Sequence, residues 1–394
     1  MNHLQKLDLQ DKRVILRVDF NVPRDSTGHI TDDTRIQLAL PTIAYIRERA
    51  SHLTLMSHLG RPQKKKLANG EIDRDSFSLE TIADHLAQLL DAPVAFQSYA
   101  DDPSMAKLTL LENTRFEQGE EQGDRAFAQM LAKHGDVYVN DAFGTAHRRH
   151  ASTAVIAEEF SPENRGIGLL MADELEQAQK LLDSDTHPIT AVIGGAKVSD
   201  KIGVIESLLD LCDNLLIGGA MAYTFIKAQG GKVGTSLVED DKMQMALDVI
   251  EKAKQSGTSL HLPIDSVIAQ EFNNDAEHTT CFSDDIPEGW MGLDIGARAS
   301  ETYSEIVADS KVVFWNGPMG VFEMSSYAHG TLSVAQAMAK VKENGGFSMV
   351  GGGDSVAAIN ASGLADEVSF ISSGGGAMLE FLEGKTLPGV AALG

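Results

Sequence analysis

The sequence predicts an α/β protein built as two lobes on parallel sheets, with a helical connector between them. Short apolar runs alternate with amphipathic helical segments along the 394 residues, which is the pattern of repeated βα units. Arginine-bearing polar segments follow the apolar runs in the first half, and glycine clusters follow them in the second. Between the halves, Ala172 to Leu182 is charged and helical and has no strand signal beside it, so we expect it to connect the lobes.

Four predicted strands in the first half end in polar segments. They span residues 13–19, 52–56, 108–111 and 137–139. If these strands are parallel, their polar ends converge on one crevice at the carboxyl edge of the sheet, where open α/β sheets bind ligands. The side chains placed there are Asp19, Asn21, Arg35, His58, Arg61, Arg115, His147, Arg148 and His150. The pattern favours an oxyanion pocket, and an Asx turn with ordinary surface arginines is the alternative.

Composition limits the classes of partner. The net charge of −24 argues against nucleic acid or an anionic membrane. Thirteen of the fourteen arginines precede Asp185, which suggests a small, localised anion site in the first half. The two cysteines, Cys212 and Cys281, are far apart, as expected in a reducing compartment. The N-terminus lacks a signal-peptide core, and Leu215 to Ile226 is too short to span a bilayer, so we expect a soluble cytoplasmic protein.

In the second half, one unit recurs: a short apolar strand, a glycine cluster and a helix. The clusters are Ile193-Gly194-Gly195, Ile217-Gly218-Gly219, Trp315-Asn316-Gly317-Pro318, Val350 to Gly353 and Ile371 to Gly376. Bare backbone along a sheet edge suits a nucleotide whose phosphates lie near helix N-termini. Close packing of strands against helices is the alternative, and it accounts for one or two clusters better than for five.

Charged residues beside these glycines predict phosphate binding. Lys197 and Lys201 are four residues apart after Gly194-Gly195, and we expect both on one face of a helix, forming a phosphate cradle. The segment is not a P-loop, because no Gly-Lys-Ser/Thr has the required spacing. Asp354 is either a helix N-cap or a carboxylate that holds Mg²⁺, and Glu323 is placed to accept from ribose hydroxyls. The last helix is expected to open on Gly374 to Gly376, whose N–H groups no side chain obstructs.

Eight ordered motifs closely resemble those of the phosphoglycerate kinase family. They are RVDFNVP, SHLGRP, LLENTRF, NDAFGTAHR, GGAKVSDK, FWNGPMGVFE, GGGDS and SSGGGA, and the resemblance runs from about Arg13 to the C-terminus. It implies two doubly wound, Rossmann-like domains joined by a hinge helix. On this basis residues 1–171 bind the acid substrate, 172–186 connect, 187–375 bind nucleotide, and 376–394 return toward the first domain.

The resemblance implies a glycolytic phosphotransferase that moves a phosphoryl group reversibly from 1,3-bisphosphoglycerate to ADP, in line, with Mg²⁺, as a monomer. The implied acid-substrate ligands are Asp19, Phe20, Asn21, Arg35, His58, Leu59, Gly60, Arg61, Arg115 and Arg148. The implied nucleotide ligands are Gly194, Gly195, Lys197, Lys201, Gly218, Gly219, Gly296, Asn316, Pro318, Glu323, Gly352, Gly353, Asp354 and Ser355, with Asp354 toward the metal. The implied catalytic groups are Arg35, Lys197, Lys201 and the amides of Gly375 and Gly376.

Three positions depart from the family pattern. Arg149 stands where the family usually has a small residue, which leaves open whether it shares the role of Arg148; Ser355 replaces a threonine, and Ala220 replaces a glycine. The acceptor in the reverse direction is a carboxylate, already ionised at pH 7, so no general base is expected. Two alternatives remain: an NAD-dependent two-domain dehydrogenase, which lacks its G-x-G-x-x-G motif here, and a non-catalytic member of the same fold.

Overall fold

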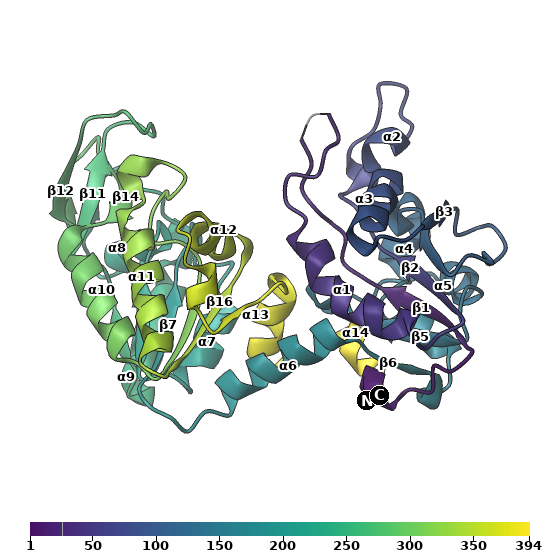
Figure 1. Ribbon diagram of the computed structural model, residues 1–394. Coiled ribbons are helices and arrows are strands. Elements are labelled where there is room, and N and C mark those ends of the chain that lie inside the picture. The colour runs from purple at the N-terminus through teal and green to yellow at the C-terminus, as the bar shows by residue number, and fades with distance from the viewer. Residues whose placement is uncertain (26) are drawn as a thin grey trace. The chain divides into compact units, whose positions relative to one another are not determined.

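The chain divides into two compact units, each described here by itself (Figure 1). The computed structural model describes residues 1–25 and 27–394. Unit 1 comprises Met1–Glu176 with Thr386–Gly394, and unit 2 comprises Gln177–Lys385. The chain passes from one unit to the other within helix α6 (Leu169–Leu182).

Helix α6 begins three residues earlier than expected, because unit 1 supplies partners for its first N–H groups. The Leu169 N–H donates to Thr42 Oγ1 at 3.0 Å, and the Met171 N–H donates to Asp141 Oδ1 at 3.0 Å. A helix N-terminus leaves such groups without intrahelical partners, so these contacts stabilise the first turn.

Unit 1, within the described residues, is built on a parallel six-stranded sheet in the order β3-β4-β2-β1-β5-β6. The strands are β1 (Arg13–Arg17), β2 (His52–Met56), β3 (Ala95–Gln97), β4 (Leu108–Leu111), β5 (Val137–Asn140) and β6 (Arg165–Ile167). The helices are α1 (Thr34–Arg47), α2 (Arg74–Phe77), α3 (Glu80–Leu90), α4 (Gln118–Gln122), α5 (Arg125–Ala132) and α14 (Pro388–Ala391). The four strands expected to carry polar ends are β4, β2, β1 and β5. They are neighbours and parallel, which confirms that prediction.

Both faces of this sheet are covered. On one face, Ile43 of α1 and Ile82 of α3 pack in the same core as Val14 and Leu16 of β1. On the other face, the turn after α5 lies against Ile15, whose side chain points away from those of its neighbours Val14 and Leu16. Strands buried on both sides are mostly apolar, and nearly every residue of the central four strands is buried, including Thr54 and Thr109.

Helices α2 and α3 are separated at Ser78, because the end of β4 supplies competing partners for the backbone there. The Asn113 side chain donates to the Phe77 carbonyl at 2.9 Å. The Glu112 carboxylate accepts from the Ser78 hydroxyl and from the Leu79 N–H, both at 3.0 Å. Ser78 is therefore extended, with φ −64° and ψ 146°, and separates α2 from α3.

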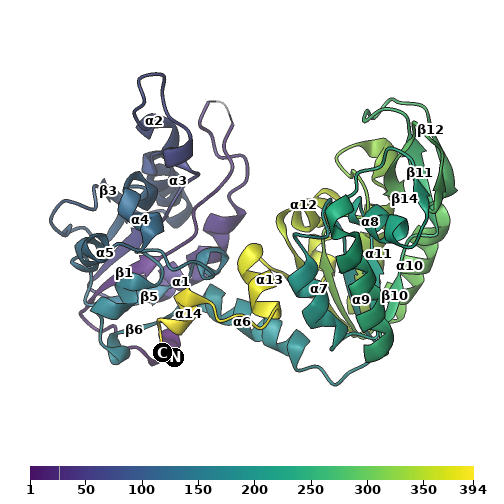
Figure 2. The same cartoon turned by 180° about the vertical axis from the view of Figure 1, so that it is seen from behind.

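Unit 2, again over the described residues, holds a second parallel six-stranded sheet in the order β10-β8-β7-β15-β16-β17. The strands are β7 (Ile189–Ile193), β8 (Asn214–Ile217), β10 (Ser259–His261), β15 (Val312–Asn316), β16 (Phe347–Gly351) and β17 (Phe370–Ile371). The helices are α7 (Ile202–Leu209), α8 (Met221–Ala228), α9 (Met243–Ser256), α10 (Ala297–Asp309), α11 (His329–Glu343), α12 (Gly353–Ala361) and α13 (Gly376–Leu382). Helices α10 and α11 lie side by side on one face (Figure 1), and α7 and α9 cover the other (Figure 2). The five glycine clusters follow five neighbouring strands, as predicted.

Two features of unit 2 differ from expectation. Helix α13 begins at Gly376 with Gly375 as its N-cap, but it is not the last helix, since α14 follows in unit 1. The sequence also did not predict a small antiparallel sheet, ordered β12-β11-β14, nor the parallel pair β9–β13. These strands are β9 (Lys232–Val233), β11 (Asp265–Ala269), β12 (His278–Phe282), β13 (Asp285–Ile286) and β14 (Met291–Ile295).

Candidate active site

In unit 1, the end of β1 holds a charged contact. Arg35 Nη1, from the first turn of α1, lies 2.9 Å from Asp19 Oδ2, and His58 Nδ1 lies 3.9 Å from Asp19 Oδ1. The Asn21 N–H donates to Asp19 Oδ1 at 3.1 Å. The Asx turn and the cluster of predicted ligands are therefore both present, because the Asp19 carboxylate accepts from the Asn21 N–H and also contacts Arg35.

Hydrogen bonds tie the ends of β1, β2 and β4 together at Gly60. Its N–H donates to Asn21 Oδ1 at 2.8 Å, and its carbonyl accepts from Arg115 Nη1 at 2.7 Å. Gly60 has φ +61°, and a Cβ there would lie 2.4 Å from the Phe77 ring, so only glycine fits without strain. Asn113 adds a further link by accepting from the Leu59 N–H at 3.2 Å.

The remaining predicted ligands of unit 1 behave differently from one another. Phe20 and Leu59 are buried and shape the site by packing. Arg61 is exposed, and its side chain makes no hydrogen bond or ion pair within residues 1–25 and 27–394. Arg148 is also exposed, with its Nε 3.0 Å from His147 Nε2. Arg149 instead pairs with Glu158 at 2.7 Å, so it is engaged outside this cluster.

The site carries excess positive charge around neutral imidazoles. Burial, followed by the charges of Arg17, Arg115 and Arg35, lowers the pKa of His58 well below its ordinary value. Burial and the same kind of neighbours lower the pKa of His150 to about 3. Clustered cations raise each other's free energy unless an anion lies among them, so the arrangement favours an anionic ligand.

The depressed pKa of His150 predicts a pH effect on unit 1. An unfolded chain protonates this histidine below about pH 6.5, whereas the folded protein does so only near pH 3. Between these two pH values the unfolded state binds more protons than the folded state. The free energy of unfolding therefore rises with pH, by at most about 1.4 kcal/mol for each pH unit. Amide hydrogen exchange in β1 and β5 should therefore show His150→Gln gaining stability relative to wild type between pH 7 and pH 5. The exposed His29→Gln is the matched control, and a pH-independent difference for His150→Gln contradicts the argument.

Sequence reasoning missed two buried polar residues of unit 1. Arg17, the last residue of β1, is 1% exposed, and Asn113 is fully buried beside Leu59 and Phe77. The signal for Arg17 was an arginine inside an otherwise apolar strand. For Asn113 the only local signal was an Asx turn, since its Oδ1 accepts from the Arg115 N–H at 3.0 Å. The two carbonyls to which its side-chain amide donates are more than thirty residues away in sequence.

In unit 2, a pocket of about 390 Å³ opens at the glycine-rich edge of the sheet. The predicted residues that line it are Gly195, Gly219, Pro318, Glu323 and Asp354. Its apolar lining comes from residues that the sequence did not single out: Tyr223, Leu237, Phe272, Met291, Leu293, Met319 and Val321. Gly296 is not among the lining residues. It caps α10, and a Cβ there would lie 2.2 Å from the Asp265 carboxyl carbon.

The glycines beside this pocket also permit close backbone contact. The Gly194 N–H donates to the Asn316 carbonyl at 2.9 Å, and the Gly219 N–H donates to the Met319 carbonyl at 2.9 Å. A Cβ on Gly218 would lie 2.3 Å from the Met319 sulfur. Close packing therefore explains part of the glycine pattern, alongside the open edge that faces the pocket.

We expect Gly194→Ala to destabilise unit 2, because its Cβ would lie 2.1 Å from the Pro318 carbonyl oxygen, which is backbone and cannot rotate away. Overpacking of this kind costs about 1–3 kcal/mol. Urea unfolding followed by tryptophan fluorescence measures this unit, since Trp290 and Trp315 both lie in it. Gly353→Ala, with no atom within 4 Å, is the control. Equal unfolding midpoints for the two variants contradict the prediction.

The expectation that Lys197 and Lys201 share a helix face is wrong. Helix α7 begins only at Ile202, and both lysines lie in the preceding loop. Glu239 is the physical reason, because its carboxylate accepts from the Ser199 N–H at 3.0 Å and from the Ser199 hydroxyl at 2.6 Å, anchoring the loop. Lys197 is exposed there, and Lys201 donates to the Asn316 side chain.

Around Lys201 the structure brings together three predicted residues of the nucleotide site. Burial lowers the pKa of Lys201, and the charges of Asp354 and Asp200 partly offset that effect. Asn316 is 1% exposed, and its Nδ2 has no partner within the described chain. Ser355 Oγ accepts from the Gly317 N–H at 2.5 Å. A cation and an unpaired amide donor beside a glycine-edged pocket suit a phosphate ligand.

Asp354 is not an N-cap, because Gly352 occupies that position and Asp354 lies exposed in the first turn of α12. Within the described residues, no group of three or more His, Cys, Asp or Glu side chains is arranged to hold a metal. Mg²⁺ often binds through one or two carboxylates together with substrate phosphates, and a single carboxylate beside a phosphate site fits that mode.

Comparison with known proteins identifies the family to which this architecture belongs. The family model for phosphoglycerate kinase matches residues 4–385. Curated phosphoglycerate kinases include one from Herpetosiphon aurantiacus, 51% identical over 97% of this chain and 96% of its own length. Another, from Synechococcus elongatus, is 49% identical over 99% of this chain and 97% of its own length.

Solved structures agree with these sequence matches. The structure of phosphoglycerate kinase from Coxiella burnetii has a TM-score of 0.88 and 39% identity, covering 100% of this chain and 98% of the other. The crystal structure of the enzyme from Pyrococcus horikoshii OT3 has a TM-score of 0.82 and 30% identity, with the same coverage. The two-unit α/β fold, the arginine cluster and the glycine-edged pocket thus occur in a chain that belongs to the phosphoglycerate kinase family.

Proposed function

We propose that the two units divide the substrates of this glycolytic kinase between them. Unit 1 binds 3-phosphoglycerate or 1,3-bisphosphoglycerate, and unit 2 binds ADP or ATP. The single observation that best supports this assignment is the cationic cluster at the neighbouring ends of β1, β2, β4 and β5. Arg35 pairs there with Asp19 and Arg115 with Glu121, whereas the side chains of Arg61 and Arg148 have no acidic partner within the described residues. An acid substrate with two anionic ends supplies the missing negative charge.

In unit 1, the proposed ligands act by position and charge. Arg35 and Arg115 are already held by Asp19 and Gly60, so they lose little conformational freedom when substrate binds. The exposed guanidinium groups of Arg61 and Arg148 present paired donors that match carboxylate or phosphate oxygens. Arg149, paired with Glu158, is left outside the proposed ligand set.

In unit 2, the pocket of about 390 Å³ is the proposed site of the nucleoside. Its apolar lining suits a base, and Glu323 at its rim is exposed and able to accept hydrogen bonds from ribose hydroxyls. Gly195, Lys197, Lys201 and Asn316 are proposed to meet the phosphates, together with the N-terminal turn of α12. The amides of Gly375 and Gly376 are proposed to contact the transferred group. Gly296 does not line this pocket, so it would contact the nucleotide only if the base extended beyond the pocket.

Mg²⁺ is the proposed metal, with Asp354 as its protein ligand. When bound, the ion neutralises phosphate charge and helps to orient the nucleotide. The residues of the chain do the rest of the work. Lys201 and Arg35 place fixed positive charge where the moving phosphoryl group would develop charge, which is worth most when water is excluded.

Transfer requires that the acyl phosphate and the ADP oxygen come within roughly 3–3.5 Å, in line. Because we assign the two substrates to different units, we propose that the units close on each other about a hinge that includes α6. No general base is needed, since the attacking oxygen belongs to an ionised phosphate or carboxylate.

A coupled assay tests this proposal. With 1,3-bisphosphoglycerate and ADP, ATP should form only when Mg²⁺ is present, and no NAD⁺ should be reduced or NADH oxidised by this chain alone. Turnover of a nicotinamide cofactor would favour the dehydrogenase alternative, and binding without turnover would favour a non-catalytic member. Titration of each substrate into two separate variants then checks the assignment. Arg61→Ala should weaken binding of 3-phosphoglycerate only, and Glu323→Ala should weaken binding of the nucleotide only.

We further propose that the protein acts in the cytoplasm as a monomer, as suits a glycolytic enzyme with two unpaired cysteines. Within the part of the chain that the structure describes, no helix has both the length and the apolar character needed to cross a bilayer. Light scattering with size-exclusion chromatography should give one chain, close to 42.3 kDa.

A further inference from the structure

Arg17 is buried beneath the acid-substrate site and makes contacts that the proposed chemistry does not use. It is the last residue of β1 and 1% exposed. Its Nη2 lies 3.0 Å from His58 Nδ1, its Nε donates to Ser152 Oγ at 2.8 Å, and its Nη1 donates to the Val18 carbonyl. Every nitrogen of the guanidinium is thus directed at a particular partner.

The contact with His58 determines where the imidazole proton sits. A guanidinium carries only N–H donors and no acceptor, so His58 Nδ1 must accept. His58 is then neutral and carries its proton on Nε2. Within the described residues, the only hydrogen bond of the ring is the one at Nδ1, so Nε2 is left without a protein partner, although His58 as a whole is only 3% exposed. An N–H group is therefore available to an anionic oxygen in the site.

A buried carboxylate balances Arg17 from the opposite side through a serine hydroxyl. Ser152 Oγ accepts from Arg17 and donates to Glu120 Oε1 at 2.5 Å, while the Ser152 N–H donates to Glu120 Oε2 at 3.0 Å. Glu120, in α4, is fully buried, and burial raises its pKa while Arg17 and Ser152 act against that shift. A buried charge without a partner is costly, so Glu120 and Ser152 explain how a guanidinium group can be buried below the site.

We propose that Glu120, Ser152 and Arg17 form a positioning chain that holds His58 as the neutral Nε2–H tautomer, so that it donates to the acid substrate. The chain runs over four elements that are distant in sequence, β1, the end of β2, α4 and the loop after β5, and all of it lies within unit 1. This inference rests on the proposed acid site for its functional consequence, but the tautomer itself is a property of the protein without ligand.

The charged and titratable groups that face His58 all bear on its protonation. They are Arg17, Asp19, Arg35, Arg115 and His150. Burial is the largest cause of its lowered pKa, and Arg17 comes next. Removing Arg17 should therefore raise the pKa of His58, and an acidic limb should appear in the pH dependence of KM for 3-phosphoglycerate.

Long-range ¹H–¹⁵N NMR of the histidine rings in the full-length protein, without substrate, tests the tautomer directly. We expect the His58 ring, assigned by comparison with His58→Gln, to show the neutral Nε2–H pattern from pH 5 to pH 8. A protonated ring, or the Nδ1–H tautomer, in the wild-type protein overturns the proposal. The experiment needs no turnover, so it is separate from the assay of the proposed function.

The functional role needs a variant that removes Arg17 without leaving Glu120 charged and unpaired. Arg17→Met/Glu120→Gln does this, and Ser152→Ala is a milder second variant in case the double change does not fold. KM for 3-phosphoglycerate should rise about tenfold, the size expected for a lost hydrogen bond to a charged group, with kcat changed less. Mixed tautomers of His58 should accompany this change.

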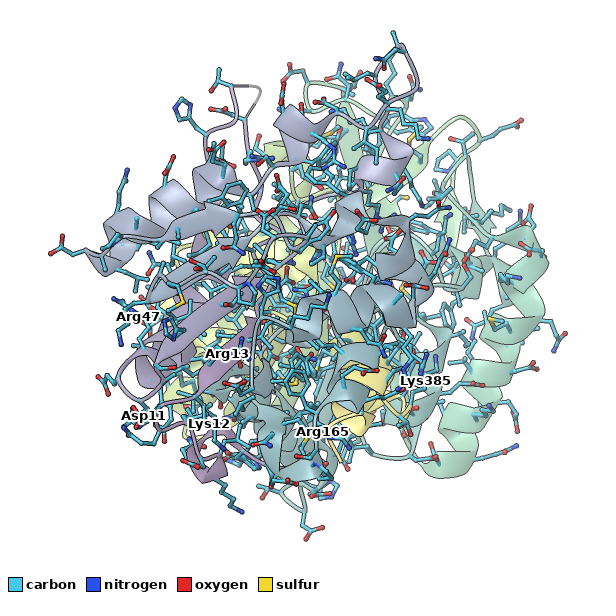
Figure 3. The ribbon with its side chains drawn as sticks, turned by 90° about the vertical axis from the view of Figure 1, so that its right-hand side faces the viewer. Asp11, Lys12, Arg13, Arg47, Arg165 and Lys385 are labelled. Carbon is cyan, nitrogen blue, oxygen red and sulfur yellow. The ribbon has the colours of Figure 1, made fainter. Side chains whose placement is uncertain are left out.

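Arg13→Met is the matched control, because Arg13 lies at the start of the same strand (Figure 3) and pairs with Asp136. It should leave KM and the His58 spectrum unchanged. Should the double variant, or the folded Ser152→Ala protein, keep a single Nε2–H tautomer and a wild-type KM, the positioning role is overturned. Weak 3-phosphoglycerate binding by the wild-type protein counts instead against the proposed function.

Discussion

Lys201→Ala should lower kcat about 10²–10³-fold while the fold of unit 2 is retained, the loss seen when one fixed donor to a developing negative charge is removed. Lys201 is half-buried, donates to Asn316 and lies close enough to Asp354 for their charges to interact. Its ammonium group is thus held close to the pocket that we propose for the nucleotide before any substrate binds. Steady-state kinetics with 3-phosphoglycerate and MgATP measures the effect, and KM for ATP should change less than kcat.

The control for this prediction is Lys227→Ala, which removes an exposed lysine that pairs with Asp240 on the same unit. It should retain wild-type kcat. Circular dichroism and tryptophan fluorescence establish whether each variant is folded. A folded Lys201→Ala protein with wild-type kcat would remove this lysine from the mechanism.

Arg35→Ala should cause a loss of comparable size, about 10²–10³-fold in kcat/KM for 3-phosphoglycerate. Its Nη1 contacts Asp19, and the rest of the guanidinium is open to a ligand, since the side chain is 39% exposed. Arg35→Lys should recover only part of the activity, because an ammonium group cannot contact Asp19 and a phosphoryl oxygen with the same paired geometry. The reverse-direction coupled assay measures both variants.

Arg47→Ala is the matched change for Arg35, since Arg47 lies in the last turn of the same helix (Figure 3). It should cost a few tenths of a kcal/mol of stability through the helix dipole and should leave catalysis intact. If Arg35→Ala and Arg47→Ala gave the same kcat/KM, the assignment of Arg35 to the reaction would be wrong.

The parts of the site that could be predicted from sequence are those that local pattern determines. Apolar runs followed by Asp19, His58 or Arg115 marked strand ends, and parallel pairing then placed those ends together. In unit 2 the glycine clusters marked the strand ends in the same way. Both signals arise within a few residues of chain, so they can be recognised without knowledge of the fold.

The parts that could not be predicted depend on contacts between distant residues. Lys197 and Lys201 have helical spacing, but Glu239, some forty residues later, anchors Ser199 and keeps the loop out of the helix. Phe272 and Leu237, which line the pocket proposed for the nucleoside, lie in separate segments without any local motif. Their role exists only once the pocket has formed.

The return of Thr386–Gly394 to unit 1 has a consequence for biosynthesis. Leu387 and Leu393 are buried there, and the Gly389 N–H donates to the Ala146 carbonyl at 2.8 Å, on the loop that carries Arg148. In chain order all of Gln177–Lys385 precedes these residues, so they reach unit 1 only after the whole of unit 2 has been synthesised. Unit 1 can therefore complete the packing around the loop that carries Arg148 only after that point, although most of its residues are made first.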